Sequence, residues 1–166
     1  MMRLTVILNI LIADILLMVK KPVYLDVCAL SRPFDDQDYM RIRLETEAVN
    51  LILSKIKQSK YRLLVSPVHF KEIGAIEDNF ERIELQTILE KLGEPVIVNK
   101  AQTRTRAEEL VNLGFGVADA AHVAFAEKAG ALFISCDNKL IKKCLNHKIN
   151  VWCGNPVAFC EMEDLR

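Results

Sequence analysis

Residues 113–137 read LGFGVADAAHVAFAEKAGALFISCD, and this stretch decides how the chain is expected to fold. Glycines precede a compact apolar helix, Gly130 ends that helix, and a short buried strand follows it. Asp119 lies in the first turn of the helix, and Asp137 lies just past the end of the strand. Each acid alone could be a helix cap, so the meaning of the pair depends on the rest of the chain.

Apolar strands alternate with helices along the remaining sequence. We expect strands at residues 22–30, 61–65, 95–98, 131–134 and 149–152. Helices are expected at residues 37–57, from Pro67, at 78–91, 101–113 and 138–146, and from Pro156. This alternation predicts an α/β fold with three α/β/α layers around a central, mostly parallel sheet of four to five strands. Right-handed crossovers then place the carboxyl ends of all strands at one edge.

Length and charge limit the organisation of the protein. The 166 residues predict one domain at 21–162, with an apolar extension at 1–20 and a short tail at 163–166. Lys and Arg together number 22, and so do Asp and Glu, so the formal net charge is zero. Because proteins that coat nucleic acids are usually basic, any nucleic-acid contact must come from a local patch.

The N-terminal extension differs from the rest of the chain. Its apolar run at 4–19 contains Asn9 and Asp14, and no signal-peptide cleavage site follows it. A membrane span needs roughly 20 apolar residues, so the run is short for that purpose. A signal anchor, an extra helix packed on the domain or on a partner, and a dispensable extension before Met18 all remain open. We expect no stable membrane association and a cytoplasmic location.

The cysteines predict reduced thiols in or near the core. Their number is odd, and no two have CxxC spacing: they are Cys28, Cys136, Cys144, Cys153 and Cys160. A structural zinc site built from Cys136, Cys144 and His147 would lack a fourth ligand at suitable spacing.

Two further acids fall in apolar surroundings. Asp26 lies within the first expected strand, and Glu72 shares a helix face with Val68 and Ile76. A buried carboxylate is costly unless it is paired or bound to a cation. Asp26 alone could cap a turn and Glu72 alone could lie at the rim of its face. Four acids in this order instead predict a cluster at the carboxyl edge of the sheet: Asp26, Glu72, Asp119 and Asp137.

Such a cluster indicates metal-dependent chemistry. Neighbouring carboxylates repel one another and persist together when divalent cations lie between them. Ligation by oxygen alone favours Mg²⁺ or Mn²⁺, which can activate water for attack on a phosphodiester. The histidines form no Ser-His-Asp or Cys-His arrangement, and His122 is expected to be a packed core residue rather than a catalytic one.

At this point the sequence resembles the PIN-domain ribonucleases, especially the toxins of VapBC-type toxin–antitoxin pairs. The resemblance covers about residues 22–159. It is carried by four ordered motifs: LDVCAL with Asp26, SPVHFKEI with Glu72, GVADAAHVAFAEKAG with Asp119, and ALFISCDNKL with Asp137. Each motif alone is weak, but the ordered set is fairly specific.

The resemblance implies an endoribonuclease that uses Mg²⁺ or Mn²⁺ to cut single-stranded RNA and leave a 5′-phosphate. The four acids would bind the metal and Ser135 would support them. An antitoxin protein and a homodimer are expected partners. Arg32 and Lys139 follow the first strand and Asp137, so they are candidates for contacts to RNA phosphates. Where the family usually has a hydroxyl or Asn after the first Asp, this chain has Val27 and Cys28.

Two alternatives belong to other functional classes. One is a catalytically silent module of the same fold that binds RNA or a protein. The other is a different α/β protein with an acid cluster, such as a haloacid dehalogenase-like phosphatase or a phosphoacceptor domain. Such a phosphatase would need an Asp where Cys28 stands, and a phosphoacceptor domain would need a lysine in place of Asp137. The residues present at these two positions therefore favour the nuclease over both alternatives of this second kind.

Overall fold

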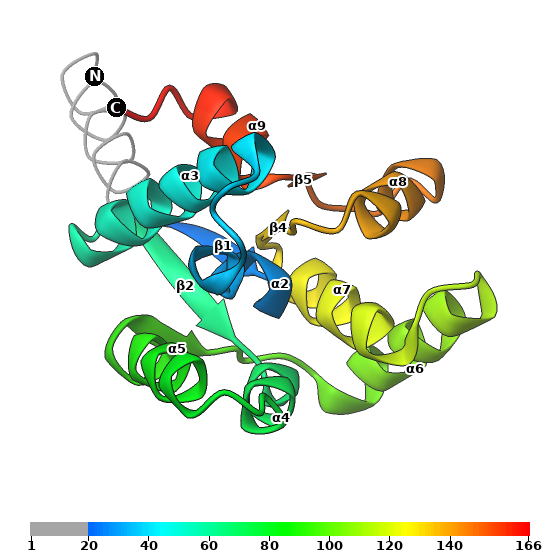
Figure 1. The fold of residues 1–166 in the computed structure, drawn as a ribbon. Helices are drawn as coiled ribbons and strands as arrows, with labels where there is room; N and C mark the ends of the chain where they lie inside the picture. The colour runs from blue at the N-terminus through cyan, green and yellow to red at the C-terminus, as the bar shows by residue number, and fades with distance from the viewer. Residues whose placement is uncertain (1–19) are drawn as a thin grey trace, which may run out of the picture.

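The structure is a computed structural model, and it describes residues 20–166 (Figure 1). The prediction for the N-terminal extension therefore lies outside the described residues. Within residues 20–166, no helix is both long enough and apolar enough to cross a membrane.

The sheet has five parallel strands in the order β3-β2-β1-β4-β5. The strands are β1 (Lys21–Leu25), β2 (Tyr61–Val65), β3 (Gly93–Pro95), β4 (Leu132–Ile134) and β5 (Cys153–Gly154). Successive strands are added on one side of β1 and then on the other, so the order reverses between β1 and β4. This reversal is the topological switch point, where open α/β sheets place their sites at the carboxyl ends of the strands.

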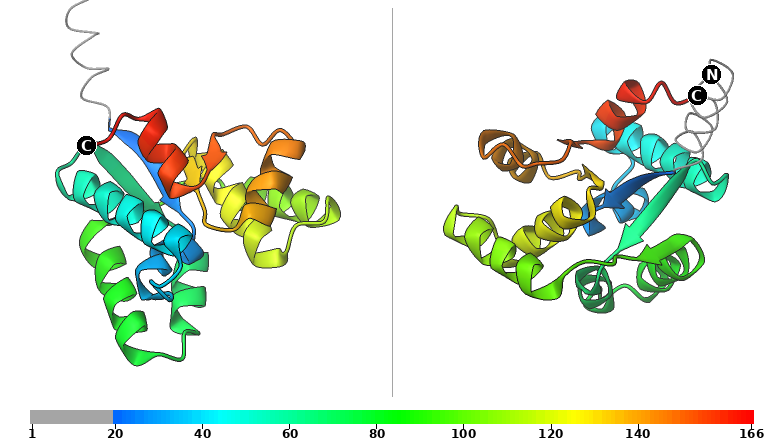
Figure 2. Two further views of the ribbon diagram at one scale, coloured as in Figure 1. Left: turned by 45° about the horizontal axis from the view of Figure 1, so that its top comes forward. Right: turned by 180° about the vertical axis from the view of Figure 1, so that it is seen from behind.

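Helices cover both faces of the sheet, as Figures 1 and 2 show. They are α2 (Val27–Leu30), η1 (Arg32–Phe34), α3 (Met40–Lys57), α4 (Pro67–Gly74), α5 (Asn79–Leu92), α6 (Lys100–Asn112), α7 (Val117–Ala129), α8 (Asn138–Asn146) and α9 (Pro156–Met162). Side chains of β1 alternate between two core clusters: Val23 and Leu25 pack with α3, α5 and α9, whereas Tyr24 packs with α6, α7 and α8. The predicted three-layer α/β/α architecture is confirmed.

Three strands differ from the expected ones. The first ends at Leu25, because Asp26 begins the short helix α2 and the apolar residues after it are buried in helical form. In so short an apolar run, periodicity cannot distinguish a buried strand from a buried helix. The third strand pairs earlier, over Gly93–Pro95, and Ile97 beyond it is 95% exposed. The fifth was expected at 149–152 and lies just beyond that range, at Cys153–Gly154.

Capping residues, proline and glycine in the sequence predicted most of the observed helix ends. Gly130 has φ 62° and ends α7 in the left-handed conformation, which only glycine adopts without strain. Ser66 and Pro67 start α4 through a capping box that His69 completes. Helix α3 starts at Met40 rather than at residue 37.

The C-terminal residues contact the start of β1. Glu163 accepts hydrogen bonds from Lys21 Nζ at 2.8 Å and from the Tyr61 hydroxyl at 2.8 Å. The tail that begins at this residue therefore attaches to the edge of the sheet opposite to the candidate site.

Candidate metal centre

The switch point places Asp26 at the centre of the carboxyl edge. Asp26 follows β1 directly, is 6% exposed, and donates its backbone N–H to the Ile134 carbonyl oxygen of β4 at 2.9 Å. This bond continues the pairing of β1 and β4 by one residue. The side chain of Asp26 is therefore fixed by the sheet rather than by a loop.

One oxygen of Asp26 is held by neighbouring side chains. Ser135 Oγ donates to Asp26 Oδ2 at 2.8 Å, and Cys28 Sγ donates to the same oxygen at 3.1 Å. Ser135 is fully buried and also accepts the Asp137 N–H at 3.1 Å. Cys28 thus makes a polar contact with the Asp26 carboxylate, although its side chain is a thiol rather than a hydroxyl or an amide. These contacts orient the carboxylate and leave Oδ1 for other partners.

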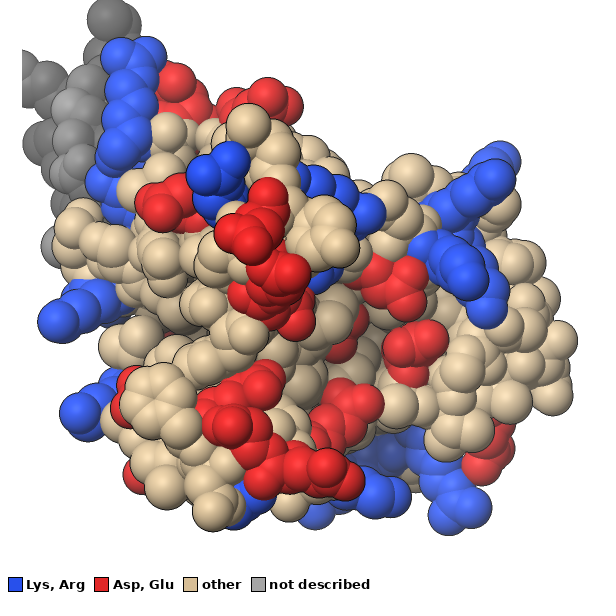
Figure 3. All heavy atoms as spheres, in the orientation of Figure 1, with Lys and Arg blue, Asp and Glu red and all other residues tan. Residues whose placement is uncertain are grey.

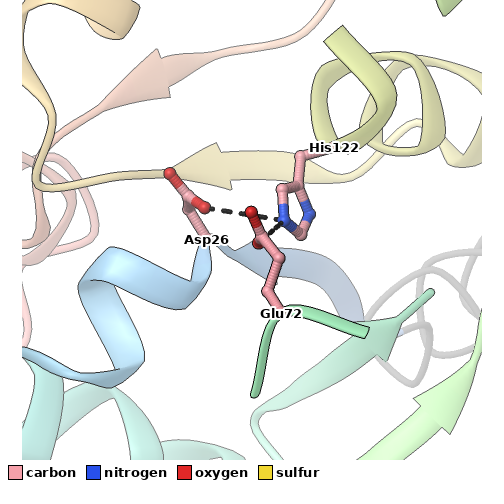
Figure 4. Close-up of side chains that lie close together, drawn as sticks. All are labelled: Asp26, Glu72 and His122. Carbon is pink, nitrogen blue, oxygen red and sulfur yellow. Dashed lines mark hydrogen bonds and ion pairs between the residues drawn. The ribbon is translucent and has the colours of Figure 1, made fainter. Parts of the chain in front are cut away.

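Glu72 approaches from α4 and meets His122 of α7 (Figure 4). Its Oε2 atom lies 2.5 Å from His122 Nε2. This hydrogen bond lowers the pKa of Glu72 below its ordinary value, against the opposing effect of burial. The same Nε2 atom lies 3.8 Å from Asp26 Oδ1. The Nε2 atom of the imidazole therefore faces both carboxylates.

Tyr24 and Ser66 hold the other side of the imidazole. The Tyr24 hydroxyl lies 2.7 Å from His122 Nδ1 and 2.6 Å from Ser66 Oγ. Tyr24 and His122 are buried, and burial raises the pKa of Tyr24, so its hydroxyl stays protonated. A continuous hydrogen-bonded chain thus runs from Ser66 through Tyr24 and His122 to Glu72.

His69 contacts the Ser66 end of this hydrogen-bonded chain. Its Nδ1 accepts the Ser66 N–H at 3.0 Å, and its Nε2–H donates to the Leu25 carbonyl oxygen at 2.8 Å. Burial first, and then the nearby His122, lower the pKa of His69 to about 4. A neutral His69 therefore joins the end of β1 to the start of α4 and fixes the helix that carries Glu72.

The structure brings together only part of the predicted acid set. Asp26, Glu72 and His122 each offer one ligand atom, and these atoms lie within 4.8 Å of one another; Asp119 and Asp137 are not members of this described group. Asp119 is half-buried, and burial raises its pKa, followed by the charges of Asp26 and Asp137. Asp137 is exposed, and its Oδ1 caps α8 by accepting the Lys139 N–H at 2.7 Å.

His122 is the functional candidate that sequence reasoning placed differently. It is 1% exposed, as expected of a core residue, but its Nε2 contacts Glu72 and its Nδ1 contacts the Tyr24 hydroxyl. Its position three residues after Asp119 puts both side chains on one face of α7. This spacing was the sequence signal that could have placed His122 in the site.

The donor set suits a divalent cation. Asp26 and Glu72 each offer a carboxylate oxygen, these atoms and a His122 ring nitrogen lie within 4.8 Å of one another, and Asp119 lies in the same negative field. Repulsion among these carboxylates would be relieved by a bound cation. Asp26 and Glu72 are therefore the residues that would hold the metal.

The two predicted phosphate contacts differ in their surroundings. Arg32 is only 16% exposed and forms ion pairs with Glu45 at 2.9 Å and Asp35 at 2.7 Å. Its charge is thus used within the chain, and its contact with RNA stays a prediction. Lys139 is exposed and makes no ion pair among residues 20–166.

Comparisons with known proteins bear on the fold. No protein-family model matches the sequence, and a search of curated proteins gives no match. The structure is similar to the crystal structure of FitAcB from Neisseria gonorrhoeae, with a TM-score of 0.50 and 15% identity, covering 81% of this chain and 97% of that chain. The chain has a PIN-like fold.

A second structure similar to this PIN-like chain is that of FitAB bound to an IR36 DNA fragment. Its TM-score is 0.48 at 17% identity, and the match covers 81% of this chain and 95% of that chain. At these identities the likeness concerns the fold, so the chemistry of the site has to be argued from its own residues.

Proposed function

We propose that this protein is a divalent-metal-dependent endoribonuclease that hydrolyses single-stranded RNA and acts as the toxin of a toxin–antitoxin pair. The observation that carries the proposal is the convergence of Asp26 and Glu72 with a third donor at the switch point of a PIN-like sheet. A buried acid cluster at this position has no evident structural purpose, because each carboxylate raises the electrostatic cost of the others.

In this proposal the chain's own residues position the metal and the substrate. Asp26, Glu72, Asp119 and Asp137 would hold Mg²⁺ or Mn²⁺, directly or through water, with Asp26 and Glu72 nearest to each other. Ser135 and Cys28 hold Asp26 Oδ2, so that Oδ1 faces the site. When bound, the cation supplies activation of a water molecule and stabilises charge on the phosphodiester. By the resemblance to the PIN-domain ribonucleases, the proposed products carry a 5′-phosphate.

The distribution of charge supports RNA as the substrate. Residues 138–160 contain no Asp or Glu but four lysines, namely Lys139, Lys142, Lys143 and Lys148. Figure 3 shows acidic side chains near the middle of one face and basic side chains beside them in the region of α8. Because Asp137 caps α8, this basic helix begins at the candidate site. A polyanion bound at the metal would find its flanking phosphates near these lysines.

Protein partners belong to the same proposal. The resemblance to VapBC toxins leads us to propose a homodimer, a small antitoxin that masks the site, and a cytoplasmic location. Exposed apolar side chains at the start of α3 support a protein contact: Tyr39 is 65%, Met40 62% and Leu44 54% exposed. Light scattering of the purified chain, alone and after co-expression with a neighbouring antitoxin-like frame, tests both partners.

Substitution of the acids tests the activity. We expect Asp26→Asn and Asp119→Asn each to reduce cleavage of a single-stranded RNA in Mn²⁺ by at least about 100-fold, because each removes a charge needed at the metal. Circular dichroism should show that both variants remain folded. Asp38→Asn, in the exposed loop before α3, is the matched control and should cleave like the unchanged protein.

The outcomes separate the alternatives. Full activity of Asp26→Asn or Asp119→Asn would overturn the nuclease assignment. Titration of Mn²⁺ that gives neither binding nor cleavage would favour a silent module. Hydrolysis of a small phosphate ester without RNA cleavage would favour a phosphatase.

A further inference from the structure

His122 occupies a place in the site that an all-carboxylate metal centre does not explain. Its Nε2 atom lies 2.5 Å from Glu72 Oε2 and 3.8 Å from Asp26 Oδ1. A cation held by Asp26 and Glu72 would lie close to Nε2, because the donor atoms of the three residues lie within 4.8 Å of one another. Figure 4 shows the imidazole pointing toward both carboxylates.

We propose that His122 Nε2 is a direct metal ligand, so that the centre has mixed nitrogen and oxygen ligation with Asp26 and Glu72. This inference rests on the metal site of the proposed function. In the observed hydrogen bond Nε2–H donates to the Glu72 carboxylate, so a ligating neutral imidazole would carry its proton on Nδ1 instead, and both His122 and Glu72 would then hold the cation. Only small shifts are needed, because the three donor atoms already lie within 4.8 Å of one another.

Tyr24 provides the orienting contact that a ligating histidine needs. Metal-binding histidines almost always donate their other ring N–H to a fixed acceptor, which sets the tautomer and the ring orientation. The Tyr24 hydroxyl oxygen lies 2.7 Å from His122 Nδ1 and can accept that proton. Its own hydrogen then goes to Ser66 Oγ at 2.6 Å. A hydroxyl both donates and accepts, so this arrangement leaves the Nε2 lone pair free for a cation.

The packing of α7 holds this ligand in place. Ala120 and Val123, on either side of His122 along the helix, are fully buried. The Tyr24 ring also contacts both imidazoles, with its centroid 5.6 Å from that of His122 and 4.6 Å from that of His69. A rigid imidazole binds a metal without an ordering cost. His122 thus has the burial, the orientation and the neighbours of a built ligand.

Mixed ligation changes which metal the site prefers. Imidazole nitrogen suits transition-metal ions, whereas Mg²⁺ favours oxygen donors and keeps several waters. We therefore expect Mn²⁺ to bind this protein at least about 10-fold more tightly than Mg²⁺. Removal of the imidazole should reduce that preference.

Pulsed electron paramagnetic resonance of Mn²⁺ tests the ligand directly, without reference to cleavage. The unchanged protein should show coupling of the bound Mn²⁺ to a histidine nitrogen. His122→Gln should abolish this coupling and weaken Mn²⁺ binding, measured by calorimetry, by at least about 10-fold, with less than about a threefold effect on Mg²⁺. His147→Gln, which changes an exposed histidine, is the matched control and should retain both coupling and affinity.

A second variant and the possible outcomes complete the test. Tyr24→Phe keeps the ring but removes the orienting hydroxyl, so it should retain the nitrogen coupling and weaken Mn²⁺ binding about 10-fold. Bound Mn²⁺ without nitrogen coupling in the unchanged protein would overturn this inference and leave the nuclease proposal standing. Nitrogen coupling in a protein that cuts no RNA would overturn the nuclease proposal alone. Absence of Mn²⁺ binding would overturn both.

Discussion

At the residue scale, burial decides the protonation state of His69. Its ring is fully buried, accepts the Ser66 N–H and donates to the Leu25 carbonyl, so both nitrogens are used by the neutral form. Protonation would place a hydrogen where Nδ1 now accepts one, beside a second histidine. The pKa of His69 is accordingly lowered to about 4.

This lowered pKa makes stability depend on pH. The unfolded chain takes up a proton at His69 near pH 6.5, whereas the folded chain does so only near pH 4. Stability from this residue is therefore complete above pH 6.5 and falls by up to about 3 kcal/mol as the pH drops to 4. We expect urea unfolding between pH 7 and pH 4 to show this loss.

His69→Gln should flatten that part of the profile. Glutamine supplies one acceptor and one donor and is a favoured partner of serine in a capping box, but it does not titrate. His147→Gln, at an exposed histidine, should leave the profile unchanged. An unaltered acid loss in His69→Gln would show that other groups cause it.

At the scale of elements, α3 is tied to the loop after β1 by a buried carboxylate. Glu45 is 2% exposed and pairs with Arg41 at 2.8 Å and with Arg32 at 2.9 Å. Both arginines also reach the Cys136 carbonyl oxygen next to Asp137. These contacts link three elements around the candidate site, so the sequence-based assignment of Arg32 to RNA alone omits a structural role.

Glu45→Gln should therefore destabilise the protein strongly. It removes the buried negative charge that pairs with both Arg32 and Arg41, at a cost of about 3 kcal/mol in the free energy of unfolding. Glu108→Gln is the matched control, because Glu108 also pairs with an arginine four residues away but is 63% exposed. Its effect should stay below about 0.5 kcal/mol. Equal effects of the two changes in urea unfolding would contradict this structural role of Glu45.

The elements themselves were largely predictable. Alternating patterns and the Ser66-Pro67 and Gly130 signals placed the helices on either side of the site, since capping and left-handed glycine act locally. Strand ends were less predictable. β3 and β5 have three and two residues, and such short pairings are set by the neighbouring strand rather than by their own sequence.

At the scale of the whole molecule, a neutral chain carries a divided surface. Asp26 and Glu72 meet at the carboxyl edge of the sheet, and the acid-free segment 138–160, which carries four lysines, begins next to Asp137 at the same edge. The local patch that the neutral composition requires for RNA binding thus has a definite location.

Neutralising this patch should weaken RNA binding in a salt-dependent way. In a cleavage-deficient Asp119→Asn background, Lys139→Gln with Lys142→Gln should reduce the slope of log affinity against log salt by about 1.4, or about 0.7 for each phosphate no longer neutralised by a lysine. Fluorescence anisotropy with a single-stranded RNA measures this. Lys57→Gln with Lys60→Gln is the matched control; both lysines are exposed, Lys57 at the end of α3 and Lys60 just before β2. The same slope of log affinity against log salt in both double variants would contradict the proposed contact of RNA with the lysines of α8.

The sequence by itself determined the layered α/β fold, the parallel sheet and the acids that follow its strands, because hydrophobic periodicity and capping are local properties. Only the tertiary structure decided which side chains meet. Asp26, Glu72 and His122 are separated by 46 and 50 positions, and they converge because β1 lies between β2 and β4 while α4 and α7 pack beside it. Periodicity shows which face of a helix is buried, but not what lies opposite. For that reason His122 is predicted from the sequence to be a packing residue, whereas in the fold its Nε2 atom faces two carboxylates.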